Sequence, residues 1–182
     1  MNRSTPSGDG SGQRGYREQM GRWMIVGAWL LLLALLTLFF SQWMARQNNP
    51  NQHLRAEADV RSGSSITLKR NRAGHYVAPG NINGVGVDFL LDTGATFVAV
   101  PESIAQKAGL VKGPMTESMT ANGIASSWLT EIDEVQLGPI VQRHVRATIL
   151  PGMAGDEVLL GMNFLRHLKL EQRGDSLKIP VP

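Results

Sequence analysis

The 182-residue sequence contains no cysteine. This excludes disulfide bonds, thiolate metal sites and cysteine nucleophiles. It does not fix the compartment, because a core of ordinary size needs no disulfide even in an oxidising environment. With 42% hydrophobic residues and 20 glycines, the chain has the composition of a globular protein.

Charge of one sign is not concentrated in the chain. The net charge is +3, and from residue 61 onward 12 Lys and Arg residues stand against 11 Asp and Glu residues. Only 6% of the residues are aromatic, and no basic stripe with interleaved aromatic residues occurs. The sequence therefore predicts no nucleic-acid partner.

Several catalytic and binding motifs are also missing. No Gly-x-Ser-x-Gly elbow and no phosphate-binding loop occur, which argues against a serine hydrolase and a nucleotide site. The four histidines lack the spacing of metal ligands. They are His53, His75, His144 and His167. Structural roles are the simpler interpretation, so we expect no metal and no cofactor.

One long hydrophobic run is present, residues 23–45, which carry no charge and lie between Arg22 and Arg46. About 20 apolar residues in a helix span a hydrocarbon core of ~30 Å. Trp23 and Trp43 stand near the two ends, where tryptophan favours the membrane interface. A cleaved signal peptide has a shorter apolar region and a small-residue cleavage site, so we predict an uncleaved transmembrane anchor helix.

The remaining chain divides by composition. Residues 1–22 resemble a disordered N-terminal tail, residues 46–64 a polar linker, and residues 65–182 a folded domain. In the domain, short β-type runs such as Val85–Leu91 and Ile140–Leu150 alternate with turn residues. This pattern predicts an all-β, small closed domain with one short C-terminal helix.

The segment Phe89–Thr96 carries the chemistry. Asp92 follows three apolar residues, so it ends a buried strand, and Gly94 allows a tight turn directly after it. Asp-Thr-Gly alone is only moderately specific, because aspartate and glycine are common in turns.

A second segment strengthens the interpretation. Together with the Asp-Thr-Gly-Ala run, the later run Val158–Leu165 resembles the two signatures of retropepsin-like (retroviral-type) aspartic proteases, with Leu160, Gly161 and Asn163 in the second signature. The resemblance covers about residues 66–180, and the layout of anchor and domain is similar to a bacterial membrane-anchored branch. It implies an aspartic endopeptidase whose second signature packs beside the catalytic loop.

The resemblance also implies roles. Asp92 would be the catalytic carboxylate, Thr93 would hydrogen-bond across a dimer axis, and Gly94 would leave room for the substrate backbone. The mechanism needs two carboxylates, and the chain has one Asp-Thr-Gly, so a homodimer acting on an extended peptide is expected. Asn122 and Gly123 would form the tip of a flap over the substrate.

Two positions depart from relatives. Ala95 stands where many relatives carry a hydroxyl that donates to the carboxylate, and this predicts a mildly acidic rather than strongly acidic pH optimum. Met162 replaces an arginine that supports the dimer in viral relatives, so confinement in the membrane would assist dimerisation.

The arginines before the span favour a short cytoplasmic N-terminus and an exported catalytic domain, in a single-pass protein of the bacterial inner membrane. Two alternatives stay open. The domain could be a catalytically silent dimeric peptide-binding or scaffolding module. It could also process itself by cutting the 46–64 linker.

Overall fold

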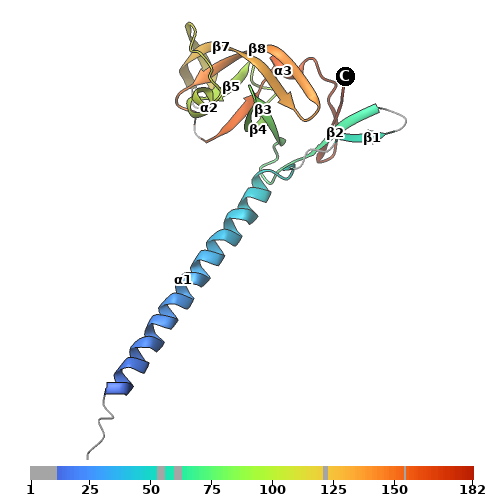
Figure 1. Ribbon diagram of the computed structural model, residues 1–182. Coiled ribbons are helices and arrows are strands. Elements are labelled where there is room, and N and C mark those ends of the chain that lie inside the picture. The colour runs from blue at the N-terminus through green and yellow to red at the C-terminus, as the bar shows by residue number, and fades with distance from the viewer. Residues whose placement is uncertain (1–11, 53–55, 60–62, 121–122, 154) are drawn as a thin grey trace, which may run out of the picture. The chain divides into compact units, whose positions relative to one another are not determined.

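A computed structural model describes residues 12–52, 56–59, 63–120, 123–153 and 155–182. The chain forms two compact units, Met1–Ala45 and Arg46–Pro182. The first is mostly helical and the second mostly β (Figure 1). The expected fold class, a closed β domain with short helices and an apolar N-terminal helix, is confirmed.

The helix α1 comprises Gly12–Asn48. Within it, Trp23–Met44 is long and apolar enough to cross a membrane, with a mean hydropathy of 2.4. The same length and composition suit a membrane span or a signal sequence. The structure differs from the expected tail of residues 1–22, since residues 12–22 are helical; residues 1–11 of this tail lie outside the described part of the chain. Helix propagation from a long apolar run into glutamine, arginine and glutamate explains the extension.

The second unit contains a seven-stranded sheet with the order β3-β4-β9-β5-β8-β7-β6. An additional pairing between β3 and β7 closes six of these strands into a barrel, to which β6 is appended (Figure 1). The strands are β3 (Val77–Ile82), β4 (Val85–Leu91), β5 (Val98–Pro101), β6 (Met115–Thr120), β7 (Gly123–Leu137), β8 (Ile140–Leu150) and β9 (Glu157–Leu160).

Turn chemistry sets the strand boundaries. Asn83 and Gly84 have φ angles of 49° and 80°, so this two-residue turn joins β3 and β4 as expected for Asn-Gly. The helix α2 (Glu102–Lys107) follows β5, and the chain leaves it through Gly109 at a φ of 68°. The helix α3 (Met162–Leu165) follows β9.

A smaller sheet has the order β1-β2-β11-β10. Its strands are β1 (Ala56–Asp59), β2 (Gly63–Lys69), β10 (Glu171–Arg173) and β11 (Ser176–Pro180). The C-terminal strand β11 therefore pairs with β2, near the start of the domain. Side chains from both sheets form one hydrophobic core, whose largest fully buried members include Phe89, Phe164, Ile66, Leu68, Leu160 and Ile179.

The expected linker is in large part ordered structure. Asn51 is buried; its Nδ2 donates to the carbonyl oxygens of Lys69 (2.9 Å) and Val77 (2.7 Å), and its Oδ1 accepts from the Lys69 amide (2.8 Å). Asn49 is also buried and donates to Asp88 on β4 at 2.8 Å. The strand β1 lies within the same expected linker, of which residues 53–55 and 60–62 are not described. Composition alone suggested a linker because asparagine is common in loops, and composition does not distinguish a loop asparagine from one that makes long-range hydrogen bonds.

Candidate active site

Asp92 directly follows β4, a strand that contributes Val87 and Phe89 to the core. Its neighbour β9 runs parallel to β4, with Leu91 paired to Leu160 and Leu90 to Leu159. The backbone amide of Asp92 donates to the carbonyl oxygen of Leu160 at 3.2 Å. Phe89 and Leu160 are fully buried, so the strand end is fixed by packing as well as by hydrogen bonds.

The turn after Asp92 holds its carboxylate. The Gly94 amide donates to Asp92 Oδ1 at 2.8 Å, and the Ala95 amide donates to the Asp92 carbonyl oxygen at 3.3 Å. A Cβ atom at Gly94 would lie 3.2 Å from the same Oδ1, closer than most side chains tolerate. Asp92 is partly buried, whereas Thr93 and Gly94 are exposed. The loop thus presents one oriented carboxylate beside an exposed threonine and glycine.

The second signature packs against this loop, as the resemblance implied. The Met162 amide donates to the Ala95 carbonyl oxygen at 2.8 Å, and the Asn163 amide to that of Thr96 at 3.0 Å. A Cβ atom at Gly161 would lie 2.3 Å from the Phe97 carbonyl oxygen. Glycine is therefore required at 161 for this approach. The catalytic roles of Asp92, Thr93, Gly94 and Ala95 stay predictions.

The expected flap corresponds to the hairpin of β6 and β7. Thr120 pairs with Gly123, whose φ is 106°, and Thr120 Oγ1 donates to the Gly123 carbonyl oxygen at 2.8 Å. Asn122 lies outside the described residues. On one face, the cross-strand neighbours Met119 and Ile124 are 88% and 69% exposed. Such apolar exposure suits a hairpin that covers a ligand, but the flap role stays a prediction.

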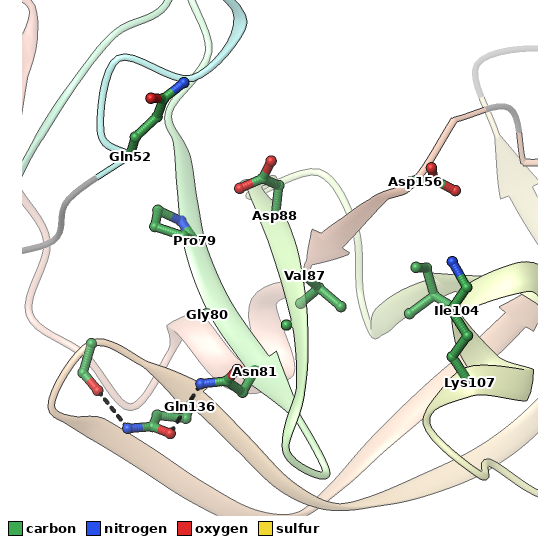
Figure 2. A pocket seen from close by; sticks show the side chains of 12 residues that line it. Gln52, Pro79, Gly80, Asn81, Val87, Asp88, Ile104, Lys107, Gln136 and Asp156 are labelled. Carbon is green, nitrogen blue, oxygen red and sulfur yellow. Dashed lines mark hydrogen bonds between the residues drawn. The ribbon is translucent and has the colours of Figure 1, made fainter. Parts of the chain in front are cut away.

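A hollow of about 920 Å³ in the second unit is lined by none of the residues of the catalytic loop. Figure 2 shows Asp88, Pro79 and Asn81 on the β3–β4 hairpin, with Asn81 hydrogen-bonded to Gln136. Asp92, Thr93 and Gly94 do not line this hollow. We therefore place the candidate active site at the Asp92 turn.

Sequence reasoning missed a basic cluster next to the loop. Arg143, His144 and Arg146 on β8 line a common pocket with Arg166 and His167, which follow α3. The signal in the sequence was the local density of basic residues in these two short runs. It was hidden because the overall charge is nearly balanced. Among the described residues, no group of three or more His, Asp or Glu side chains has the arrangement of a metal site.

Comparisons with known proteins agree with this geometry. A family model described as gag-polyprotein putative aspartyl protease matches residues 78–167, a range that contains the Asp92 turn and the second signature. An uncharacterized protein in the cobV 5′ region of a Sinorhizobium species is 32% identical over 125 residues, which are 66% of this chain and 54% of that protein. The chain thus spans about half the length of that relative.

Solved structures are similar too. The crystal structure of a retropepsin-like aspartic protease from Rickettsia conorii has a TM-score of 0.54 and 27% identity, and covers 63% of this chain and 89% of its own. The EIAV protease complexed with an inhibitor has a TM-score of 0.45 and 16% identity, over 55% of this chain and 93% of its own. With the family match, the Rickettsia structure and the Asp92 turn in agreement, the chain belongs to the retropepsin-like aspartic protease family.

Proposed function

We propose that the protein is an aspartic endopeptidase in which Asp92 activates water for the hydrolysis of a peptide bond. The observation that carries the proposal is the Asp92 carboxylate at the end of the core strand β4, oriented by the Gly94 amide and still partly exposed. A carboxylate in this position is able to take a proton from a water molecule that attacks a substrate carbonyl.

The same chemistry calls for a second carboxyl group. The protonated group donates its proton to the carbonyl oxygen as the water adds, and the resulting gem-diol collapses when the amide nitrogen is protonated and leaves. The chain supplies one Asp-Thr-Gly and one barrel. A homodimer with a two-fold axis beside the Asp92 turn would bring the two carboxylates together. Thr93 is exposed on the loop, which supports its proposed role as a hydrogen-bonding residue across that axis.

The substrate of this site is an extended peptide. Main-chain hydrogen bonds would align it as an additional strand, and side-chain pockets would provide the preference. The β6–β7 hairpin, at whose tip the sequence predicts Asn122 and Gly123, would close over the peptide and exclude water.

We also propose that α1 anchors the protein in a bacterial inner membrane, with a short cytoplasmic N-terminus and an exported catalytic domain. The support is the apolar stretch Trp23–Met44 and the arginines that precede it. The hydroxyls of Thr37 and Ser41 donate to carbonyl oxygens of their own helix, so dimerisation of the span would depend on packing. Confinement in the membrane would raise the effective concentration of protomers.

Self-processing at Asn49–Asn51, in the segment between the anchor and the domain, is less favourable than the sequence suggested. Asn49 and Asn51 are buried and hydrogen-bonded to the domain, so a protease could not bind this segment as an extended strand without undocking it. The alternative of a silent peptide-binding module has less support, because binding alone would not need the Asp92 turn.

The test is cleavage of a diverse peptide mixture by the full-length protein in lipid nanodiscs, read by mass spectrometry. Asp92→Asn is expected to lower cleavage at least about 100-fold, because general acid–base catalysis contributes that much or more. Asp133→Asn is the matched control, since Asp133 is an exposed aspartate on β7. Binding of peptides without any Asp92-dependent cleavage would favour the silent module.

A further inference from the structure

A pocket of about 660 Å³ is lined in part by Thr96 and Phe97, which follow the Asp92 turn. Three elements contribute to it: the residues that follow the Asp92 turn, the middle of β8, and α3 with the turn after it. Its lining residues are Thr96, Phe97, Gln142, Arg143, His144, Val145, Arg146, Met162, Asn163, Arg166 and His167. Three arginines and two histidines are therefore present, and among the described residues no aspartate or glutamate lines the pocket.

The charges in this pocket are only partly neutralised. Glu134 lies 3.2 Å from the Arg143 guanidinium, and Glu131 lies 2.9 Å from Nδ1 of His144. Glu131 is the direct cross-strand partner of Arg146, so it would be the natural counter-ion of that arginine. His144 has a φ of 54°, an uncommon backbone conformation for a residue other than glycine. In this conformation its Nδ1 lies 2.9 Å from Oε1 of Glu131, so the Glu131 carboxylate contacts His144.

Two of the three arginines in the pocket have no ion pair among the described residues. Among the described residues, neither Arg146 nor Arg166 has a carboxylate within ion-pair distance. Arg166 donates from Nε to Nε2 of His167 at 3.3 Å, which steadies the side chain without reducing its charge. Both arginines are exposed at the pocket and available to an anion from outside the chain.

The pocket is tied to the catalytic loop. Asn163 donates to the backbone of Thr96 through its amide at 3.0 Å and to the Arg146 carbonyl oxygen through its side chain. Gln142 Nε2 donates to the Phe164 carbonyl oxygen at 3.0 Å, so β8 and α3 are held together. Thr96 follows Asp92 by four residues, a stretch of chain that reaches about 14 Å at most. A substrate strand advances about 3.3 Å per residue, so Thr96 at the edge of the pocket lies at most about four substrate residues from the scissile bond.

We propose that this pocket selects substrates with an acidic side chain within about four residues of the cleaved bond, with Arg146 and Arg166 as the residues that bind the carboxylate. The inference rests on the proposed endopeptidase function. An aspartate or glutamate of the peptide is favoured over a free anion as the occupant, because Thr96 and Phe97, which continue the chain from the Asp92 turn, line the pocket. Arginine pairs with carboxylates through two parallel hydrogen bonds, which adds geometric selectivity to the charge.

The experiment uses full-length protein in nanodiscs of neutral lipid and a set of peptides that share one cleavable core. At each position from two to five residues on either side of the scissile bond, glutamate is compared with glutamine. The expected result is a rise in kcat/KM of about 3- to 10-fold for glutamate at one of the predicted positions, the range for partly exposed charge pairs. High salt should reduce the preference, because screening shortens the range of the interaction to ~3 Å at 1 M.

Variants assign the preference to residues. Arg146→Gln and Arg166→Gln should each remove most of the glutamate preference while leaving kcat/KM for the glutamine peptides within about twofold of wild type. Arg173→Gln is the matched control, since Arg173 is an exposed arginine on β10 and does not line this pocket. Equal loss for both kinds of peptide, or dissociation of the protein into monomers, would show that these arginines act in structure and not in selection.

The outcomes separate the two proposals. If no peptide is cleaved in an Asp92-dependent manner, the endopeptidase function itself fails, and with it this inference. If cleavage depends on Asp92 but glutamate and glutamine peptides are cut equally at every position, the function stands and the acidic preference is wrong.

Discussion

Gly161 lies against the backbone of Phe97 so closely that a Cβ atom at position 161 would be 2.3 Å from the Phe97 carbonyl oxygen. This contact joins the second signature to the catalytic loop. The neighbouring Met162 amide donates to Ala95 at 2.8 Å, so the approach and the hydrogen bond depend on one another. The position of the Asp92 turn is therefore set by a glycine nearly 70 residues away in sequence.

Gly161→Ala should consequently destabilise the domain by about 2–4 kcal/mol. The added methyl group would overlap backbone atoms of Phe97, so the catalytic loop would have to move. Thermal unfolding of the full-length protein would measure the loss. Gly86→Ala on β4 is the control, since a Cβ atom there has only Asn81 Oδ1 nearby, at 3.9 Å. Equal stability of the two variants would mean that the loop is not held by this contact.

Asn51→Ala should lower the free energy of unfolding by about 1–3 kcal/mol, because it removes the hydrogen bonds that Asn51 donates to the Lys69 carbonyl oxygen and to the buried Val77 carbonyl oxygen. Gln52→Ala, at an exposed position beside it, should have little effect. Chemical denaturation compares the two. A fragment that begins at residue 53 should also be less stable than one that begins at residue 46, and identical midpoints would contradict the role of this clamp.

Thr93→Val should weaken dimerisation without unfolding the monomer, because valine keeps the shape of threonine and removes the hydroxyl proposed to bond across the axis. We expect a rise in the dimer dissociation constant of about 10-fold, measured by analytical ultracentrifugation in detergent. Thr93→Ser keeps the hydroxyl and should remain close to wild type. A valine variant that dimerises normally would remove Thr93 from the interface.

Ala95→Ser should move the activity–pH profile to lower pH. Among the described residues, only the Gly94 amide is hydrogen-bonded to the Asp92 carboxylate, and a serine hydroxyl would add a donor that favours the ionised form. Initial rates on one peptide across the acidic range provide the measurement. Ala95→Gly changes the size of the side chain without a hydroxyl, so a similar displacement in that variant would count against the explanation.

Local features of the sequence were sufficient for much of the fold. Asn83 and Gly84 specified a tight turn, and the strands Val85–Leu91 and Ile140–Leu150 have the predicted bounds. The Asp92 turn was predictable for the same reason, since an apolar run followed by Asp-Thr-Gly is a local pattern. Its packing against Gly161 followed from the resemblance to known proteases.

Long-range relationships were not predictable. Asn51 bonds to residues 18 and 26 positions away, and nothing in its own neighbourhood distinguishes it from a loop asparagine. The pocket of Arg146 and Arg166 exists only because β8 and α3 meet at the catalytic loop. The ion pair of Glu131 with His144 accompanies a positive φ at His144, which no periodicity in the sequence predicts.

The most direct test of the central claim, that one Asp92 from each protomer forms the catalytic pair, is a subunit-mixing experiment. Wild-type and Asp92→Asn chains are co-assembled in varied ratios at constant total protein, and cleavage of one peptide is measured. If both carboxylates are required, activity follows the square of the wild-type fraction, so equal amounts give about one quarter of full activity. Activity proportional to the wild-type fraction, about one half at equal amounts, would show that each Asp92 works alone and would contradict the account.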